Sequence, residues 1–223
     1  MKQLVFLGAG IAFYEIAELI NDINCVEEKY EIIAILDDDE EKHGTTMDGV
    51  KVMGALSLAK DFPEEVSFVF GIGSRYTRKE RRKIIDTLGI DISRFETLVH
   101  PRAKVYRSAH IGHGCILHVG SVVGANTCLG DFVIVTYNSV IGAHTILEDY
   151  VMIGSSVTVL NYVHISEGAF LGVGVCVADR IKIGKYAVIG MTSFVAKNIK
   201  DGGLVIGVPN IRLGIADEFF LKQ

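Results

Sequence analysis

The sequence contains no tryptophan and only three prolines, and its four cysteines lie far apart. These cysteines form no C-x-x-C pair and have no histidine at metal-ligand spacing, so neither a disulfide scaffold nor a zinc site is indicated. They are Cys25, Cys115, Cys128 and Cys176. We therefore expect reduced, structural thiols and no bound metal.

Basic residues and long apolar runs are also scarce. Lysine and arginine number 22 against 27 aspartates and glutamates, which argues against a surface for nucleic acid or anionic membranes. No apolar run approaches the roughly 18 residues of a membrane span, and the first residues show no basic leader or cleavage site. We expect a cytoplasmic protein without membrane insertion, of ordinary globular composition.

The first part of the chain alternates β-rich runs with helical patterns. Apolar strands are expected over residues 4–10, 30–39 and 67–74, and amphipathic helices over 11–22 and 78–89. Alternation of this kind predicts a parallel sheet with crossover helices. The sequence thus indicates an α/β, Rossmann-like domain over residues 1–99.

Ligands of such sheets bind beyond the carboxyl ends of the strands. The glycine turn there is Gly8-x-Gly10, and Phe13 replaces the third glycine of a dinucleotide motif, which makes an NAD-dependent oxidoreductase a weak alternative. Asp37 and Asp38 could accept hydrogen bonds from a nucleobase or ribose. The next strand end has a backbone amide and a guanidinium suited to a diphosphate. The candidate substrate-binding residues are Gly8, Gly10, Asp37, Asp38, Gly73 and Arg75.

From Val105 onward an aliphatic residue recurs every six positions without a break in phase. Two positions earlier the residue is mostly small or β-branched, and one position later glycine is frequent. Hexapeptide periodicity of this kind predicts a parallel β-helix, here over residues 100–198. The sixteen aliphatic positions are Val105, Ile111, Leu117, Val123, Leu129, Val135, Ile141, Leu147, Ile153, Val159, Ile165, Leu171, Val177, Ile183, Ile189 and Val195.

The chain resembles the hexapeptide-repeat acyltransferases, and among them the bacterial nucleotide-aminosugar and sialic-acid acetyltransferases with a small N-terminal domain. The resemblance rests on GAG at 8–10, ILDD at 35–38, LVHPRAKV at 98–105, the hexads, and IGVPNIRL at 206–213. It implies a left-handed β-helix of triangular coils, 18 residues each, in which glycine lets the backbone turn the corner. The N-terminal domain would cap one end of the prism and residues 199–223 the other.

The resemblance also implies a function. Such proteins assemble as homotrimers that bind acetyl-CoA in the grooves between prisms, and Asn161, Val173 and Met191 are the positions implied for the cofactor. The expected activity is N-acetylation of a nucleotide-linked amino sugar for surface-glycan synthesis. An O-acyltransferase and a catalytically weakened sugar-nucleotide-binding scaffold are the alternatives.

His144 is the candidate general base. A sugar ammonium must lose a proton before it can attack the thioester, and histidine is suited to accept that proton. In the related enzymes the base follows the inward aliphatic residue by two positions, which here is Ala143, without flanking acids. His144 precedes the inward Thr145, so strand alternation would point it outward, in a column with Asn126 and Tyr162.

The sequence leaves three alternatives to a catalytic His144. The side chain could be merely solvated, it could pack between subunits, or the reaction could proceed without a protein base. For the other repeat histidines, His118 and His164, structural roles are favoured. A column of charged residues 18 apart is expected to be a solvated corner, with a functional carboxylate whose pKa is raised by the stacked acids as the alternative. Its members are His113, Asp131, Asp149, Glu167 and Lys185.

Overall fold

The computed structural model describes residues 1–73 and 79–207, and its N-terminal part is an α/β domain. Its five-stranded sheet has the order β3-β4-β2-β1-β5, and every pairing is parallel except that of β3 with β4. β1 is buried over most of its length and β5, although it is an edge strand, over all of it, as expected for a parallel sheet that is covered on both faces. The strands are β1 (Lys2–Leu7), β2 (Tyr30–Leu36), β3 (Thr46–Met47), β4 (Val50–Gly54) and β5 (Ser67–Phe70).

Two α-helices accompany this sheet. α1 (Ala12–Val26) buries Phe13, Ile16, Leu19 and Ile20, whose spacing of three and four places them on one face. α2 (Glu80–Leu88) ends at Gly89, which adopts the left-handed conformation with φ of 59°. Three short 3-10 helices complete the domain, namely η1 (Glu40–Lys42), η2 (Leu56–Asp61) and η3 (Ile92–Arg94). None of the helices in the described part of the chain combines the length and apolar character that a membrane span requires.

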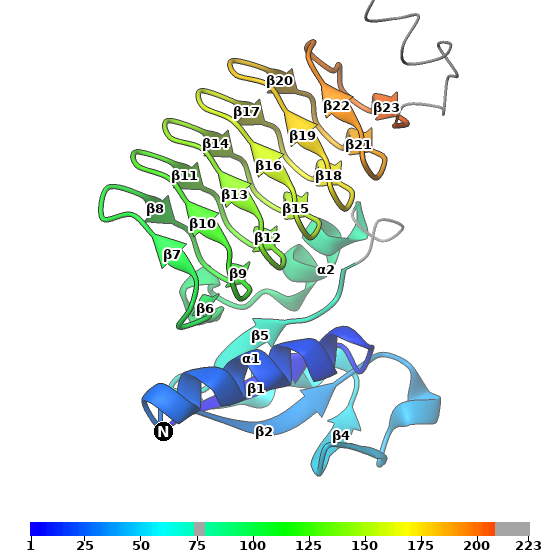
Figure 1. Cartoon of the computed structure of the whole chain (residues 1–223). Helices are drawn as coiled ribbons and strands as arrows, with labels where there is room; N and C mark the ends of the chain where they lie inside the picture. The colour runs from blue at the N-terminus through cyan, green and yellow to red at the C-terminus, as the bar shows by residue number, and fades with distance from the viewer. Residues whose placement is uncertain (74–78, 208–223) are drawn as a thin grey trace, which may run out of the picture.

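The hexads form a left-handed parallel β-helix (Figure 1). Each strand is two residues long and pairs with the strands 18 residues before and after it, apart from those at the two ends. The β6 sheet contains β6 (Leu98–Val99), β9 (Ile116–Leu117), β12 (Ile134–Val135), β15 (Met152–Ile153), β18 (Phe170–Leu171), β21 (Val188–Ile189) and β23 (Leu204–Val205). The β7 sheet contains β7 (Lys104–Val105), β10 (Val122–Val123), β13 (Val140–Ile141), β16 (Thr158–Val159), β19 (Cys176–Val177) and β22 (Phe194–Val195). The β8 sheet contains β8 (His110–Ile111), β11 (Cys128–Leu129), β14 (Ile146–Leu147), β17 (His164–Ile165) and β20 (Lys182–Ile183).

The aliphatic residue of each hexad points into the prism, as predicted. From Leu117 to Val195 these side chains are at most 4% exposed, and only Val105 and Ile111 at the first coil are half-buried. The small residues two positions earlier are also inside. Buried hydroxyls among them donate to corner carbonyls, for example Thr127 Oγ1 to Gly142 O at 2.7 Å, so no donor is left unpaired there.

Three corners join the sheets. The first corner joins the β6 sheet to the β7 sheet (residues 118–121 and their 18-residue repeats). The second joins the β7 sheet to the β8 sheet (124–127 and repeats), and the third joins the β8 sheet to the next β6 strand (112–115 and repeats). From Gly114 to Thr192 every sixth residue sits at a corner with φ between 53° and 73°, whether or not it is glycine.

The expectation that the hexad glycines turn the corners is therefore wrong. The glycine after the aliphatic residue has no positive φ, because the left-handed residue lies two positions later. A Cβ at Gly142 would lie 2.7 Å from the backbone C and O of Leu160, and one at Gly154 would lie 2.8 Å from Leu171 O. Glycine is required at these positions because successive coils approach closely.

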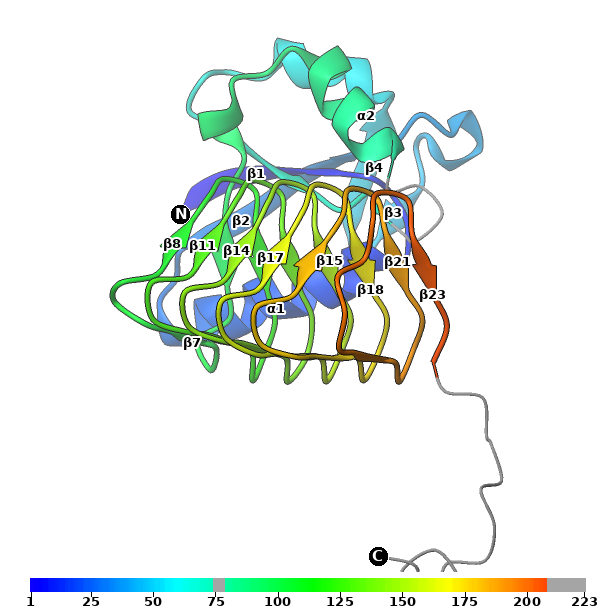
Figure 2. The ribbon, with the colours of Figure 1, turned by 90° about the horizontal axis from the view of Figure 1, so that it is seen from above.

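The α/β domain lies along the side of the prism (Figures 1 and 2), and the expectation that it caps one end is also wrong. Its α1 side packs on Leu98, Ile116 and partly buried Ile134 of the β6 sheet, and its α2 side packs on Phe132 and Tyr150 of the third corner. This side-on packing follows from apolar residues on the outer surface of three coils. At the other end, β23 and Ile199 add to the stack, and the rest of the expected cap lies outside the described residues.

Candidate functional site

The carboxyl ends of β1, β2 and β5 surround a cavity of about 250 Å³. It is lined by Gly8, Gly10, Ile11, Ala12, Asp37, Gly71, Ile72 and Gly73. Gly8 has φ of 109°, and a Cβ there would lie 2.6 Å from Ile72 Cγ1, so glycine is needed. At Gly10 a Cβ would meet nothing within 4 Å, so the backbone is open to a ligand. Four of the six sequence-predicted substrate residues thus meet in this strand-end cavity.

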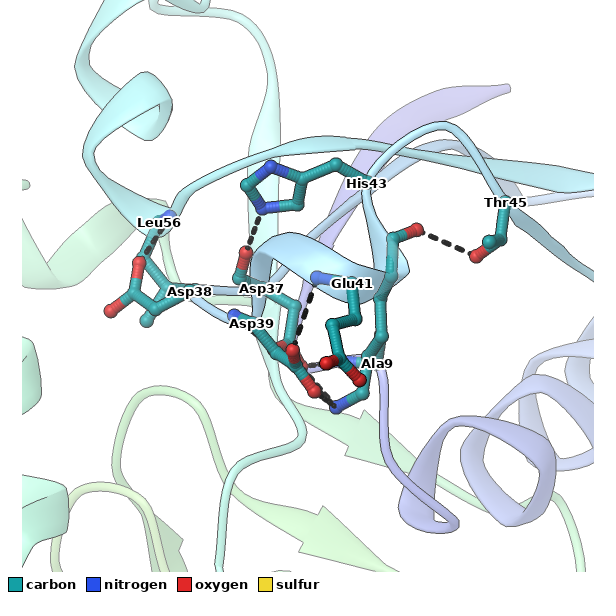
Figure 3. Close-up of polar contacts among 9 residues, drawn as sticks. Ala9, Asp37, Asp38, Asp39, Glu41, His43, Thr45 and Leu56 are labelled. Atoms are coloured by element: carbon teal, nitrogen blue, oxygen red, sulfur yellow. Dashed lines mark hydrogen bonds and ion pairs between the residues drawn. The ribbon is translucent and has the colours of Figure 1, made fainter.

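Asp37 braces the strand ends of β1 and β2 (Figure 3). Its carboxylate accepts the N–H of Ala9 at 2.6 Å and of Asp39 at 2.9 Å, and Lys42 Nζ lies 3.4 Å away. Burial opposes ionisation of Asp37, but these donors outweigh it and hold its pKa below the ordinary value. The carboxylate is therefore anionic and already engaged, so its first task is to fix the loop around Ala9.

Asp38 lies in a different cavity. Its Oδ1 accepts the N–H of Leu56 at 2.8 Å and so caps η2 (Figure 3). The cavity beside it, of about 500 Å³, is lined by Asp38, Leu56, Ser57, Lys60, Glu80, Lys83, Ile84, Thr87 and Leu88. Hence the structure separates Asp38 from the other substrate candidates, while Arg75 lies outside the described residues.

The strand-end cavity reaches the β-helix at Gly73. A Cβ on Gly73 would lie 3.6 Å from Cε of Met152 in β15 and 3.1 Å from Nε of the buried Arg81. Arg81 is not among the predicted site residues, and the basic run RKERRK that contains it predicts only a helix. The only sequence feature that could have indicated Arg81 is its positive charge on an amphipathic helix, because one face of such a helix must pack against the rest of the protein.

His144 lies at the second corner in the left-handed conformation, with φ of 55°, and is exposed. Its outward direction comes from this turn rather than from the strand alternation assumed above. The imidazole stacks on Tyr162, with ring centroids 4.9 Å apart and an interplanar angle of 5°, and Asn126 Nδ2 lies 3.4 Å from its Nε2. Arg180 covers the Tyr162 ring at 4.6 Å. We call Asn126, His144, Tyr162 and Arg180 the second-corner column.

The three predicted cofactor residues do not share a corner within the chain. Asn161 lies at the second corner, where its Oδ1 accepts the N–H of Ala143 at 2.9 Å, and it therefore ties two coils together. Val173 and Met191 lie one coil apart at the first corner and are 48% and 63% exposed. Only these two present free side chains to a ligand or a neighbouring subunit.

His118 and His164, the other two repeat histidines considered above, contact neighbouring side chains. His118 is buried beside Tyr137 in a cleft of about 320 Å³ against α1, and burial, with the nearby His100, lowers its pKa to about 4. His164 Nε2 lies 2.7 Å from Glu148. His100, which sequence reasoning missed, pairs with Asp22 at 2.8 Å and links α1 to the first coil.

The charged column at the third corner is structural rather than simply solvated. Asp131 accepts the N–H of His113 at 2.7 Å, Asp149 accepts that of Asp131 at 2.9 Å, and Asp201 that of Lys185 at 2.8 Å. These carboxylates pair backbone donors of the preceding coil, which would otherwise lack partners at the turn. No group of three or more His, Cys, Asp or Glu side chains in residues 1–73 and 79–207 is arranged to hold a metal ion.

The site can be compared with known proteins. Residues 3–85 match the family model described as the PglD N-terminal domain. The acetyltransferase domain of PglB from Neisseria gonorrhoeae FA1090, in complex with acetyl coenzyme A, is 27% identical with a TM-score of 0.81 and covers 93% of this chain and 97% of its own. No curated protein sequence gives a match.

Two further structures extend the likeness. A histidine-to-asparagine mutant of perosamine N-acetyltransferase from Caulobacter crescentus, in complex with CoA and GDP-perosamine, is 26% identical with a TM-score of 0.78, covering 93% of this chain and 94% of its own. WeeI from Acinetobacter baumannii AYE is 21% identical with a TM-score of 0.77, covering 92% and 97%, and shows the fold alone.

Proposed function

We propose a specific reaction for this chain, which is a hexapeptide-repeat acyltransferase whose residues 3–85 match the PglD N-terminal domain: transfer of the acetyl group of acetyl-CoA to the amino group of a nucleotide-linked sugar. The observation that carries the proposal is the position of the strand-end cavity, because its lining residue Gly73 lies against Met152 of the β-helix. A sugar held there would lie beside the β-helix, which is the part that the resemblance to hexapeptide-repeat acyltransferases implies for coenzyme A binding.

The substrate fits the groups in the cavity. Open backbone at Gly10 can approach a diphosphate, and the loop around Ala9 is held rigid by Asp37. The related perosamine enzyme was crystallised with a GDP-linked amino sugar, which supports the same substrate class here. A panel of substrates identifies the nucleobase, the sugar and the linkage.

The reaction needs a proton acceptor. In our proposal His144 takes one proton from the sugar ammonium, and the amine nitrogen then attacks the thioester carbon. As the C–S bond breaks, a second proton of that nitrogen passes to the sulfur, so that coenzyme A leaves as the thiol and the amide is formed. The ring is oriented by its stack on Tyr162 rather than by flanking carboxylates. Val173 and Met191, exposed at the first corner, are proposed to contact the coenzyme.

We further propose that the site is completed in a homotrimer in the cytoplasm. Large apolar side chains near the second corner are exposed in the single chain, including Val140 (39%), Ile146 (45%), Leu160 (37%) and Phe194 (61%). The second corner joins the β7 and β8 sheets and lies across the prism from Met152 in the β6 sheet, so His144 would serve the strand-end cavity of a neighbouring subunit. Burial of this apolar surface between subunits would bring the two together. Light scattering of the purified protein tests this state, and a monomer would contradict it.

The activity is tested by thiol release from acetyl-CoA with UDP-, dTDP- and GDP-linked amino sugars. We expect turnover with at least one amino sugar and none with its deoxy analogue lacking the amine. Turnover of sugars that offer only hydroxyl groups would instead support O-acylation. His144→Ala should lower kcat by about 10²- to 10⁴-fold, whereas the control His164→Ala should not. Full turnover by His144→Ala would eliminate it as the base.

A further inference from the structure

Arg81 is a buried cation between the α/β domain and the β-helix. Arg81 lies in the first turn of α2 and is only 1% exposed. Nη1 donates to the carbonyl oxygen of Tyr150 at 3.1 Å and Nη2 to that of Phe132 at 2.9 Å. These carbonyls belong to successive coils at the third corner, so one guanidinium fastens α2 to both.

The charge of Arg81 has no carboxylate partner among the described residues. Its guanidinium carbon lies 5.6 Å from the Phe70 ring and 5.7 Å from the Tyr150 ring, which provide aromatic faces but no counter-charge. Nε is buried and has no hydrogen-bond partner in residues 1–73 and 79–207. Burial lowers the pKa of Arg81 to about 10, so the group stays protonated at neutral pH.

This Nε lies beside Gly73. It lies 3.1 Å from the place where a Cβ of Gly73 would be, and Arg81 Cδ lies 3.2 Å from the same place. Gly73 itself lines the cavity, so the guanidinium lies directly behind the cavity wall. A buried positive charge that is not neutralised acts over such short distances more strongly than an exposed one.

The next residue shows what a merely anchoring arginine looks like. Arg82 donates to Glu167 at 2.8 Å, and its side chain is 55% exposed. That pair holds α2 to the following coil with its charge neutralised and in contact with solvent. The two arginines therefore share the anchoring of α2 but differ in charge balance and in their distance from Gly73.

We propose that Arg81 is a positioning residue for the sugar nucleotide: it holds the Gly71–Gly73 strand end against the β-helix and keeps a positive charge behind it that favours a bound diphosphate. The inference rests on the proposed function. It predicts that loss of Arg81 weakens the nucleotide-linked substrate selectively, whereas a purely structural role would weaken both substrates or only the folded state.

The test compares Arg81→Met, Arg81→Lys and the control Arg82→Gln in the full chain. Calorimetry measures the Kd of UDP, of GDP and of CoA, steady-state kinetics give the KM of each substrate, and thermal unfolding checks the fold. For Arg81→Met we expect the Kd of the nucleoside diphosphate and the KM of the nucleotide sugar to rise on the order of 10- to 100-fold, with the Kd of CoA and kcat nearly unchanged.

Arg81→Lys keeps the charge but not the double carbonyl contact, so we expect a rise of about 3- to 10-fold, and Arg82→Gln should bind as the wild type does. Should Arg81→Met fail to fold, Arg81→Lys decides alone. Wild-type nucleotide affinity in a folded Arg81 variant, or an equal loss of CoA binding, would overturn the inference. A wild-type chain that binds CoA but neither UDP nor GDP would instead overturn the proposed nucleotide-linked substrate, and the inference with it.

Discussion

The second and third corners of the prism have the same backbone but opposite surroundings. Phe132 and Tyr150 at the third corner have φ of 56° and 61°, and His144 and Tyr162 at the second have 55° and 58°. The first pair is covered by the α/β domain, and the second pair is exposed. The hexad repeat therefore determines the turn, while the residue placed on it and the element that covers it determine what each corner does.

The comparison also shows how bulky residues are accommodated in a strained conformation. A left-handed backbone costs a residue with a Cβ roughly 1–2 kcal/mol. At the third corner the rings of Phe132 and Tyr150 stack 5.2 Å apart and pack with Phe70 and Phe95. At the second corner the compensating contacts are the His144–Tyr162 stack and the contacts with Arg180 and Asn126, all at the surface. Stability should thus be concentrated at the covered corner.

The largest effect is expected from truncating a covered ring. Phe132→Ala should lower the free energy of unfolding by about 3–5 kcal/mol, because it leaves a cavity between the two parts of the chain. The matched change at the open corner, Tyr162→Ala, should cost under about 1 kcal/mol in the isolated chain. Chemical denaturation of both variants measures the difference. Equal losses would mean that the two corners are stabilised alike.

A smaller effect concerns the buried histidine on the covered side of the prism. His118 has a folded-state pKa of about 4, against roughly 6.5 in an unfolded chain, so the unfolded chain binds the proton first as the pH falls. The stability is therefore complete above pH 6.5 and declines toward pH 4, by up to about 3 kcal/mol. His118→Leu should remove this decline. Parallel unfolding curves against pH for wild type and variant would contradict the assignment.

A third prediction concerns the ion pair between Arg82 of α2 and Glu167 at the covered third corner. Burial opposes ionisation of Glu167, but Arg82 and the Tyr186 hydroxyl outweigh it and hold its pKa below the ordinary value. Its contribution is present above the unfolded pKa near roughly 4.3 and is lost as the pH falls through the lower folded-state value. Glu167→Gln should therefore lower Tm on the order of 2 °C at pH 7 and by less at pH 3.

The open corner provides the control for this carboxylate. Asp179 accepts the N–H of Asn161 at 2.8 Å, and an asparagine there can still accept that bond. We expect Asp179→Asn to leave Tm nearly unchanged at both pH values. A loss as large as that of Glu167→Gln would show that removing any corner carboxylate, with or without an arginine partner, has the same cost.

Much of the fold followed from the sequence because both of its patterns are local. The six-residue period predicts every inward position from Leu117 to Val195, and the alternation in the first part predicts β1, α1, β2, β5 and α2. The packing of the α/β domain on the side of the prism could not be predicted, since it depends on outward residues such as Phe132 that follow no period.

The site was less predictable for the same reason. Gly8, Gly10, Asp37 and Gly73 meet because strand ends of a parallel sheet share an edge, a rule that the sequence reveals. Asn161 accepts the N–H of Ala143 because the two residues lie on successive coils, and Asp38 accepts the N–H of Leu56 because η2 begins beside it. Neither contact follows from a pattern in the sequence. Arg81 could not be predicted as a site residue, because its partners are backbone carbonyl oxygens, which every residue has whatever its side chain.

The smallest expected effect tests whether the stack at the open corner serves the proposed base. Tyr162→Phe keeps a ring parallel to His144, so turnover should stay within about twofold of wild type. Tyr162→Leu removes the ring and leaves the imidazole free to rotate, which should lower kcat by about tenfold without changing the KM of either substrate, since only orientation is lost. Thermal unfolding of both variants checks that the fold is retained. If Tyr162→Leu has the same kcat as Tyr162→Phe while His144→Ala is inactive, then His144 is oriented by the neighbouring subunit rather than by its own coil.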